Sequence, residues 1–276
     1  MDTAVPKSIS ISSLLALRGS ASPPLVIDVR RAPAFEADAS MLAGATWRDP
    51  FAVGDWIKFL PRQSDVVVYC AHGHEISKNA CVALRAAGLN ARYLEGGIEA
   101  WKAVMAPTIK KQPALSVPSS INLASKWITR ERPKIDRIAC PWLIRRFIDP
   151  LAEFLYVPAS QVLSAAKTHA ATPYDIPGVQ FSHRGGECSF DAFVADFEID
   201  DSVLAGLAAI VRGADTDRPQ LTPQSPGLLA ISLGLSALYP NDHEMLEHGM
   251  TVYDALYAWL KSARAEVHNA DLFATS

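Results

Sequence analysis

Cys70 lies where a reactive thiol could act as a nucleophile. Residues 66–69 have the composition of a short buried strand, and Cys70 follows them directly. The loop after it leads into a helix predicted to begin at about Ile76. Backbone N–H groups at a helix N-terminus favour an anion, so we expect the pKa of the Cys70 thiol to be lowered. A thiolate there could attack a sulfur donor and hold the resulting persulfide among backbone amides.

The elements around Cys70 indicate a parallel α/β sheet. Residues 25–29 and 91–94 have the pattern of further strands, and Gly96-Gly97 opens a last helix. Strands that alternate with helices favour parallel pairing, and such sheets place ligands at the carboxyl ends of their strands. Cys81 falls on the helix after the loop, where we expect it to pack in the core.

Three motifs in this half resemble those of a single rhodanese domain. They are Asp28-Val29-Arg30, the loop that begins at Cys70, and Leu94-Glu95-Gly96-Gly97-Ile98-Glu99-Ala100-Trp101. The resemblance covers residues 8–106 and implies a rhodanese-like parallel sheet with flanking helices. It implies a persulfide on Cys70, no cofactor for sulfur transfer, and supporting roles for Asp28 and Arg30. It also implies a pocket formed by the loop residues Ala71, His72, Gly73, His74, Glu75 and Ile76.

Glu75 departs from the pattern of the rhodaneses that use thiosulfate. Those proteins typically carry an arginine at the sixth position of this loop, where this chain has a carboxylate that would repel a dianionic donor. The departure favours another small-molecule sulfur donor or thiol acceptor, a protein persulfide donor, or thiol redox or metal-sensing chemistry. The alternative is a non-enzymatic stress regulator or binding module whose rhodanese domain is catalytically inactive.

A basic segment marks the second half of the chain. Between Lys126 and Arg146, seven residues are basic and two are acidic. If the segment is helical, Arg130, Lys134 and Arg137 share one face of it. Guanidinium groups match tetrahedral oxyanions well. The alternative is a solvated helix face with surface ion pairs. The candidate anion-binding residues are Arg130, Lys134, Arg137, Arg145 and His183.

Two polar clusters further along contain residue types that bind metals. One follows the run 179–181, and the other opens a helix predicted to end at about Ala263. Imidazole, thiolate and carboxylate groups suit a divalent metal. The alternative for the first cluster is a histidine whose hydrogen bonds are satisfied beside a turn. The alternative for the second cluster is a capped helix with exposed polar ends. The candidate ligands are His183, Glu187, Cys188, His243 and Glu247. Between the clusters, residues 228–239 are apolar nearly all round and predict a central buried helix.

Three segments of this half resemble the C-terminal domain of the chromate-resistance family known as ChrB. They are residues 127–150, 181–193 and 241–259. The resemblance covers about residues 122–263 and predicts a mainly helical α+β domain. It implies a role in chromate sensing and resistance, with Arg130, Arg137 and His183 as the anion site. The best-known members carry a DNA-binding segment before this domain, and here a rhodanese-like domain takes its place.

The composition is that of a globular protein with two domains. The chain has 276 residues, of which 49% are hydrophobic and 20% charged, which excludes a disordered chain or a collagen-like repeat. We predict a rhodanese-like domain over 8–107, a proline- and serine-rich linker over 108–121, and the second domain over 122–265.

The net charge, the cysteines and the apolar stretches indicate which partners and which compartment to expect. The formal net charge of −3 gives no reason to expect nucleic acid. Four scattered cysteines suit a reducing compartment. No apolar signal segment opens the chain, and the longest apolar stretch is too short to cross a bilayer. We expect a cytoplasmic protein that does not bind membranes.

Overall fold

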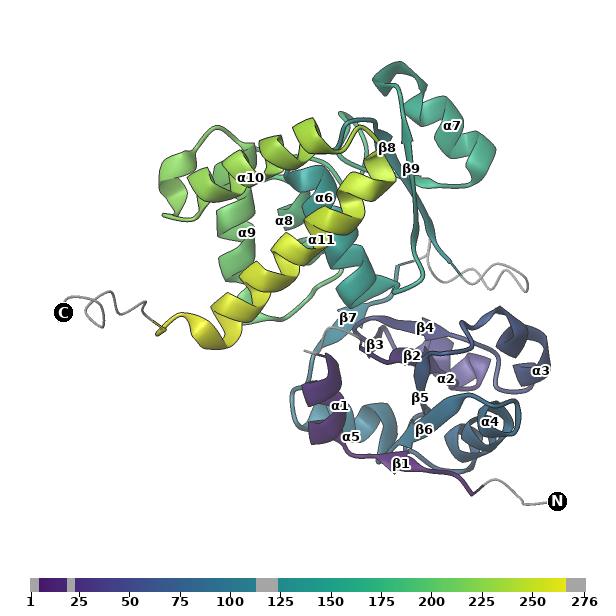
Figure 1. The fold of residues 1–276 in the computed structure, drawn as a ribbon. Coiled ribbons are helices and arrows are strands. Elements are labelled where there is room, and N and C mark those ends of the chain that lie inside the picture. Colours follow the sequence, from purple (N-terminus) through teal and green to yellow (C-terminus); the bar gives the residue numbers. More distant parts are fainter. Residues whose placement is uncertain (1–4, 19–22, 113–123, 267–276) are drawn as a thin grey trace, which may run out of the picture.

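The computed structural model describes residues 5–18, 23–112 and 124–266 (Figure 1). The first half is built on a five-stranded sheet in which every pair of neighbouring strands is parallel. Its strands, in spatial order, are β1 (Ser8–Ile9), β6 (Asn90–Leu94), β5 (Asp65–Tyr69), β2 (Leu25–Asp28) and β4 (Ala45–Trp47). The predicted α/β architecture is confirmed, and Cys70 directly follows the central strand β5.

Helices cover both faces of this sheet because the strand residues alternate between two cores. Ile27, Val66 and Val68 pack in one core with α3 (Val53–Trp56) and α4 (Glu75–Ala86). Their neighbours along the same strands pack on the other side, with α1 (Ile11–Arg18) and α5 (Gly97–Ala103). A short helix α2 (Ala32–Ala37) follows β2. Buried runs such as Val66-Val67-Val68 are typical of strands covered on both faces.

The predicted linker begins with a strand. Thr108–Lys110 form β7, which pairs antiparallel with β3 (Ser40–Leu42) at the edge of the first half. The N–H of Lys110 also donates to the carbonyl of Phe197 in the second half, at 2.8 Å. The composition suggested a segment without strand pairing, but these residues find backbone partners on both sides. Residues 113–121 of the predicted linker lie outside the described residues.

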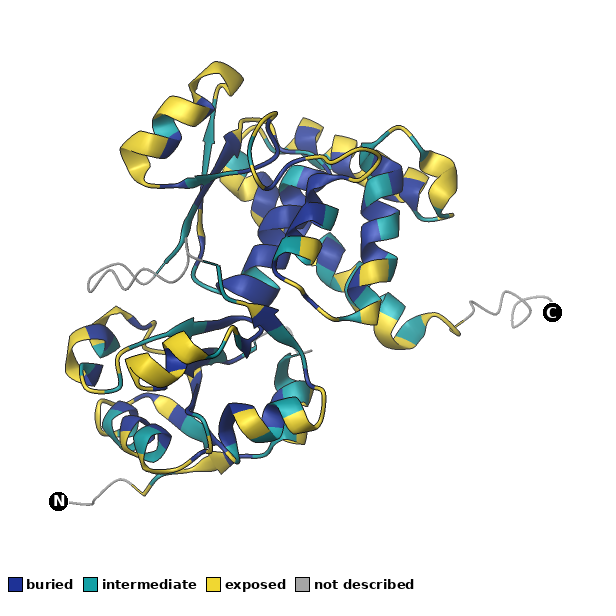
Figure 2. Cartoon of the chain, turned by 180° about the vertical axis from the view of Figure 1, so that it is seen from behind, coloured by how far each residue is buried: buried dark blue, intermediate teal, exposed yellow. Residues whose placement is uncertain are grey.

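The second half is mainly helical around a small parallel sheet, as predicted. The sheet has the order β10 (Thr172–Pro173), β8 (Lys126–Arg130) and β9 (Glu153–Val157). The helices are α6 (Asp136–Leu143), α7 (Val162–His169), α8 (Ser189–Asp196), α9 (Ser202–Asp215), α10 (Ser225–Leu238) and α11 (Asp242–Ala258). α6 is the central helix, since nearly all its residues are buried (Figure 2). It contains Pro141 and continues into a π-helical turn over Ile144–Ile148.

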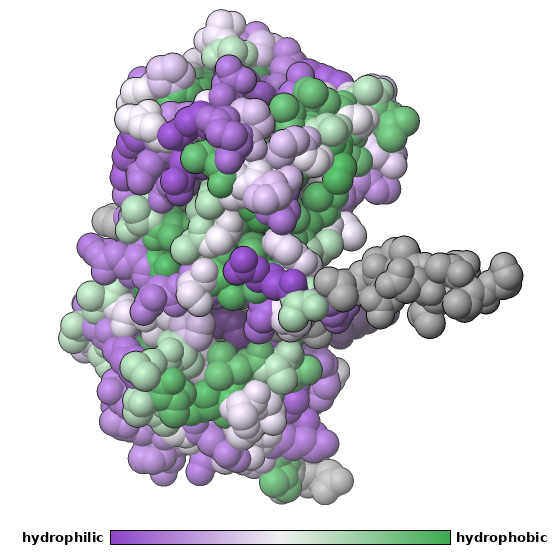
Figure 3. Space-filling model, turned by 90° about the vertical axis from the view of Figure 1, so that its left-hand side faces the viewer, coloured by the Kyte–Doolittle hydropathy of each residue, from purple (hydrophilic) through white to green (hydrophobic). Residues whose placement is uncertain are grey.

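Two local predictions for this half are wrong. Residues 126–130 form a strand, so Arg130 and Arg137 do not share a helix face. α10 is a surface helix that buries serines and exposes apolar side chains (Figure 3). Its buried hydroxyls serve backbone groups: Ser225 Oγ donates to the Ile210 carbonyl, and Ser232 Oγ accepts from the Ile135 N–H. An almost uniformly apolar helix has no periodicity that shows which face is buried.

The two halves pack against each other through one continuous core. The same hydrophobic cluster contains Trp101 of the first half and Trp142 of the second. The Gly44 N–H donates to the Phe147 carbonyl, and Lys110 Nζ lies 2.5 Å from a carboxylate oxygen of Glu198. Within the described residues, no helix is both long and apolar enough to span a membrane.

Candidate functional site

The Cys70 thiol lies at the base of a loop that supplies several hydrogen bonds to it. The loop runs from the end of β5 to Glu75, the first residue of α4, and Cys70 Sγ lies 3.3 Å from Ser77 Oγ. Burial alone would raise the pKa of Cys70. Hydrogen bonds from the Ser77 side chain and from the amides of Ser77, His72 and His74 outweigh that effect and lower the pKa. The loop therefore stabilises a thiolate, the form of cysteine that attacks sulfur.

The glycines of the 94–101 motif hold this loop from the other side. Ile98 N–H donates to the Cys70 carbonyl at 3.0 Å, and Glu99 N–H donates to the Ala71 carbonyl at 3.1 Å. Gly97 has a φ of 61°, and a Cβ built on it would lie only 2.3 Å from the Cys70 carbonyl oxygen. The start of α5 can therefore approach the loop only because residue 97 has no side chain.

The side chains of the loop face mostly toward solvent. His72, His74 and Glu75 are exposed, Ala71 and Ile76 are half-buried, and Gly73 is buried with a φ of 69°. The rings of the two histidines lie 5.8 Å apart. An exposed carboxylate at the helix start and two imidazoles are the ionisable groups that the loop presents to an incoming donor.

Asp28 and Arg30 form a buried ion pair that ties neighbouring strands together. Arg30 Nη2 lies 2.6 Å from Asp28 Oδ2, which also accepts from the Tyr69 hydroxyl at 2.8 Å. Arg30 is 2% exposed and also binds Asp38 Oδ2 at 2.7 Å. Burial would lower the pKa of Arg30, but the hydrogen bonds and charge of Asp28 raise it overall. These contacts fit a supporting role next to the strand that carries Cys70.

Replacing Ser77 by alanine should raise the pKa of Cys70. The variant removes the hydroxyl next to the sulfur while leaving the backbone amides, so the thiolate loses part of its stabilisation. The rate of alkylation by iodoacetamide, followed against pH, should rise at a higher pH than in the wild type and be several-fold lower at neutral pH. Alkylation of the unfolded chains is the control, because there the two should react alike. An unchanged pH profile of the folded variant would exclude this role of Ser77.

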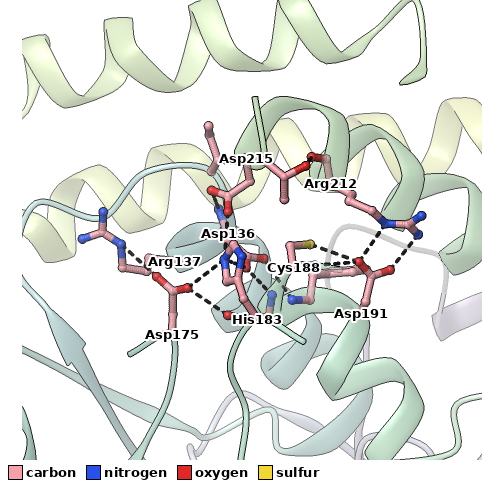
Figure 4. A network of polar contacts seen from close by, with 12 residues as sticks. Asp136, Arg137, Asp175, His183, Cys188, Asp191, Arg212 and Asp215 are labelled. Atoms are coloured by element: carbon pink, nitrogen blue, oxygen red, sulfur yellow. Dashed lines mark hydrogen bonds and ion pairs between the residues drawn. The ribbon is translucent and has the colours of Figure 1, made fainter. Parts of the chain in front are cut away.

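A second polar cluster gathers around His183 (Figure 4). His183 Nε2 lies 3.1 Å from Asp215 Oδ2, 3.4 Å from Asp175 Oδ1 and 3.5 Å from Asp136 Oδ2. Asp136 opens α6, Asp175 follows β10 closely, and Asp215 ends α9. The fold thus brings four distant segments to one point, and we call these four residues the His183 cluster.

Further contacts hold the carboxylates of this cluster in place. Asp136 is 1% exposed, and its oxygens accept from the N–H groups of Ser189 at 2.6 Å and Phe190 at 3.0 Å, at the start of α8. Asp175 accepts from the Ser189 hydroxyl at 2.8 Å. A carboxylate oriented by outer hydrogen bonds presents its remaining lone pairs in a fixed direction.

Mutual charge shifts the pKa values within the His183 cluster. Hydrogen bonds to Asp136 and Asp175 raise the pKa of His183 to about 10, against the effect of burial. Burial, together with the charges of Asp136 and Asp175, raises the pKa of Asp215 to about 7. Burial would raise the pKa of Asp175 too, but His183, Ser189 and two arginines lower it. The cluster therefore places three carboxylates around one imidazole.

Comparison with known proteins identifies the first half. The family model of the rhodanese-like domain matches residues 10–104. Thiosulfate sulfurtransferase GlpE of Pseudomonas entomophila is 33% identical over 97 residues, which are 35% of this chain and 84% of that protein. The chain belongs to the rhodanese-like family. A rhodanese-related protein of Thermoplasma volcanium is 28% identical, with 38% of this chain and 99% of that chain covered and a TM-score of 0.34.

The second half matches another family. The model of the ChrB C-terminal domain covers residues 127–260. Protein ChrB of Cupriavidus metallidurans is 35% identical over 140 residues, which are 50% of this chain. The chain spans only 42% of the length of that relative. Both resemblances drawn from the sequence are therefore confirmed: a rhodanese-like domain precedes a ChrB C-terminal domain.

The predicted anion-binding residues of the ChrB C-terminal domain do not converge as a cationic pocket. Arg130 and Arg137 both face Asp175, at 3.3 Å and 3.2 Å. Lys134 is half-buried just before α6, and Arg145 pairs with Glu247 at 2.6 Å. His183 lies among carboxylates. Because residues 126–130 form a strand, these residues do not make a basic helix face, and acidic side chains from other segments pair with Arg130, Arg137 and Arg145.

The predicted metal ligands are also dispersed, apart from His183. Glu187 is exposed, and Cys188 is buried at the N-cap of α8, where burial and the charges of Asp136 and Asp191 raise its pKa. His243 is exposed beside the ring of Tyr156, and Glu247 pairs with Arg145. Sequence reasoning missed the three aspartates of the His183 cluster, because no local spacing links residues 136, 175 and 215.

Proposed function

We propose that the rhodanese-like domain is a sulfurtransferase that uses Cys70 as its nucleophile. The observation that carries this proposal is the placement of the Cys70 sulfur: loop amides and the Ser77 hydroxyl surround it and lower its pKa. The 33% identity to a thiosulfate sulfurtransferase supports the same chemistry. All four cysteines are buried, but hydrogen bonds outweigh burial at Cys70 alone. Burial raises the pKa of each of the other three, so they are poor nucleophiles.

The reaction proceeds in two displacements. The Cys70 thiolate attacks the outer sulfur of the donor, a new S–S bond forms, and the bond between that sulfur and the rest of the donor breaks. The donor remainder leaves with the electron pair. The loop amides then hold the terminal sulfur of the persulfide as an anion. An acceptor thiolate attacks this terminal sulfur, and Cys70 leaves as a thiolate.

The loop disfavours a dianionic donor. Glu75 is exposed at the start of α4, and the neighbouring loop residues offer only two histidines as possible cations. A carboxylate close to the approach of thiosulfate raises the energy of that encounter. A low-molecular-weight persulfide or a persulfide carried by a protein is the donor class that this loop suits better.

Mass spectrometry of the full chain tests this function. The protein is incubated with thiosulfate or with glutathione persulfide, and each cysteine peptide is examined for the mass of one added sulfur atom. We expect the adduct on Cys70, with faster formation from the persulfide, and none on the buried Cys81, Cys140 and Cys188. Cys70→Ser should abolish transfer to an acceptor thiol. Absence of the adduct with every donor would reject the sulfurtransferase and favour the alternative of a binding module.

For the ChrB C-terminal domain we propose a response to an oxyanion of the chromate class, as the family resemblance implies. One observation favours it: the Arg130 side chain is 46% exposed where it pairs with Asp175 of the His183 cluster. Equilibrium dialysis of the full chain against chromate and against sulfate tests this role. Binding that Arg130→Gln weakens would support it, and no binding of either ion would reject it.

A further inference from the structure

We propose that Asp136, Asp175 and His183 bind one first-row divalent metal ion, with the Asp215 carboxylate beside His183 as an outer group. The site lies in the ChrB C-terminal domain, and it is independent of the sulfur transfer proposed for Cys70. It takes only His183 from the ligands that the sequence suggested, and it gains Asp136 and Asp175 from the tertiary structure.

The spacing of the donor atoms is the spacing found around a metal ion. Oxygen and nitrogen ligands lie about 2.0–2.2 Å from a first-row divalent ion, which places neighbouring ligands about 3.0–3.4 Å apart. In the His183 cluster, one nitrogen lies 3.1, 3.4 and 3.5 Å from three carboxylate oxygens. Donor atoms of Asp136, Asp175 and His183 all lie within 4.8 Å of one another.

Hydrogen bonding by His183 alone does not account for this arrangement. Nε2 carries at most one proton, which can point well at one acceptor, yet three oxygens from separate segments converge on it. Two of those carboxylates are buried, where charge must be balanced, and without a metal the protonated His183 and the two arginines at Asp175 provide that balance. A metal ion would take the place of the His183 proton and accept donors from Asp136, Asp175 and His183 together, with His183 as a neutral imidazole.

The surroundings fit a bound ion of the manganese or iron class. Two carboxylates and one imidazole are an oxygen-rich donor set. Two neighbouring sulfurs contact carboxylates: Cys188 Sγ lies 3.3 Å from Asp191 Oδ2, and Cys140 Sγ lies 3.5 Å from Asp136 Oδ1. Ser189 binds both Asp136 and Asp175 and so acts as an outer support for two ligands. His183 is 41% exposed, which leaves one side open for water or an anionic ligand.

The charges indicate what that open side attracts. Three carboxylates and the two arginines at Asp175 leave one net negative charge when His183 is neutral. A divalent ion reverses this to one net positive charge. The metal therefore supplies the attraction for an oxyanion that the arginines, already paired with Asp175, do not supply alone.

Titration of the chelator-treated full chain with MnCl₂ tests the site. Electron paramagnetic resonance measures free Mn²⁺, and calorimetry measures the stoichiometry. We expect one ion per chain, with at least a tenfold loss of affinity in His183→Ala and in Asp215→Asn. His183 is 41% exposed and Asp215 is partly exposed, with one long backbone hydrogen bond from Asp136 N–H at 3.4 Å, so the variants should fold. Thermal unfolding without metal checks that they do.

The matched control is the double variant His243→Ala, Glu247→Gln. It removes another histidine and carboxylate of the same domain, both exposed on α11, and should bind Mn²⁺ like the wild type. Repeating the titration with Zn²⁺ and with anaerobic Fe²⁺ ranks the metals. The proposal is overturned if the wild type binds none of the three ions, or if folded His183→Ala and Asp215→Asn variants bind as tightly as the control.

Discussion

Replacing Gly97 by alanine should abolish persulfide formation at Cys70 and destabilise the rhodanese-like domain by about 3 kcal/mol. The added Cβ would lie 2.3 Å from the Cys70 carbonyl oxygen and 2.5 Å from that of Ala71. Both atoms belong to backbone, so the clash is relieved only by moving the loop that surrounds the sulfur. The left-handed φ of 61° adds strain for any residue with a side chain. Donor-dependent persulfidation and urea unfolding measure the two effects.

Gly88 provides a matched control for this prediction. It also has a positive φ, 90°, and follows α4 in the same domain, but a Cβ there would meet nothing within 4 Å. Gly88→Ala should therefore cost only the backbone strain, about 1 kcal/mol, and leave persulfidation near the wild-type rate. If Gly97→Ala transfers sulfur as fast as Gly88→Ala, the close approach of α5 does not shape the loop.

The second large effect is expected for Asp28→Ala, which should destabilise the chain by about 3 kcal/mol. Asp28 is fully buried, and its carboxylate binds both Arg30 and the Tyr69 hydroxyl. The variant leaves the buried Arg30 guanidinium with Asp38 as its remaining carboxylate partner. Because breaking a buried pair leaves an incompletely compensated charge, the loss exceeds that for a surface pair. The midpoint of urea unfolding, monitored by circular dichroism, reports it.

Asp65→Ala is the control for charge removal in the same sheet. Asp65 lies on β5 and pairs with Arg92 at 3.7 Å, with about half of its side chain exposed. Solvent screens such a pair, so we expect a loss below about 1 kcal/mol. Equal destabilisation by the two variants would show that the Asp28–Arg30 pair adds nothing beyond a surface ion pair.

The rhodanese-like half was predictable because its chemistry is local. The strand, the thiol, the loop and the helix N-terminus follow one another from Val66 to Ala86, so the order of residues already places the sulfur at the start of a helix. The glycine motif is a second local signal. What the sequence did not give is the contact between them, the hydrogen bonds from Ile98 and Glu99 to the loop carbonyls.

For the ChrB C-terminal domain, the sequence predicted only the fold class. Apolar periodicity indicated a mainly helical domain and placed α10 at its centre, and the shared face of Arg130 and Arg137 was expected only if residues 126–130 were helical. The strand is fixed by pairing with β9 and β10, partners that lie far along the chain. α10 lies at the surface because its serines satisfy backbone groups of neighbouring segments, which no one-dimensional pattern reveals.

The sequence by itself determined the two families, the parallel sheet and the position of Cys70 after its central strand. The families follow from the resemblance of their motifs. The sheet and the place of Cys70 follow from neighbouring residues, since strand and helix propensities act over short stretches of chain. Only the tertiary structure decided the His183 cluster and the pairing of Arg130 and Arg137 with Asp175. These depend on which distant segments share a buried space, where the cost of unpaired charge brings opposite charges together.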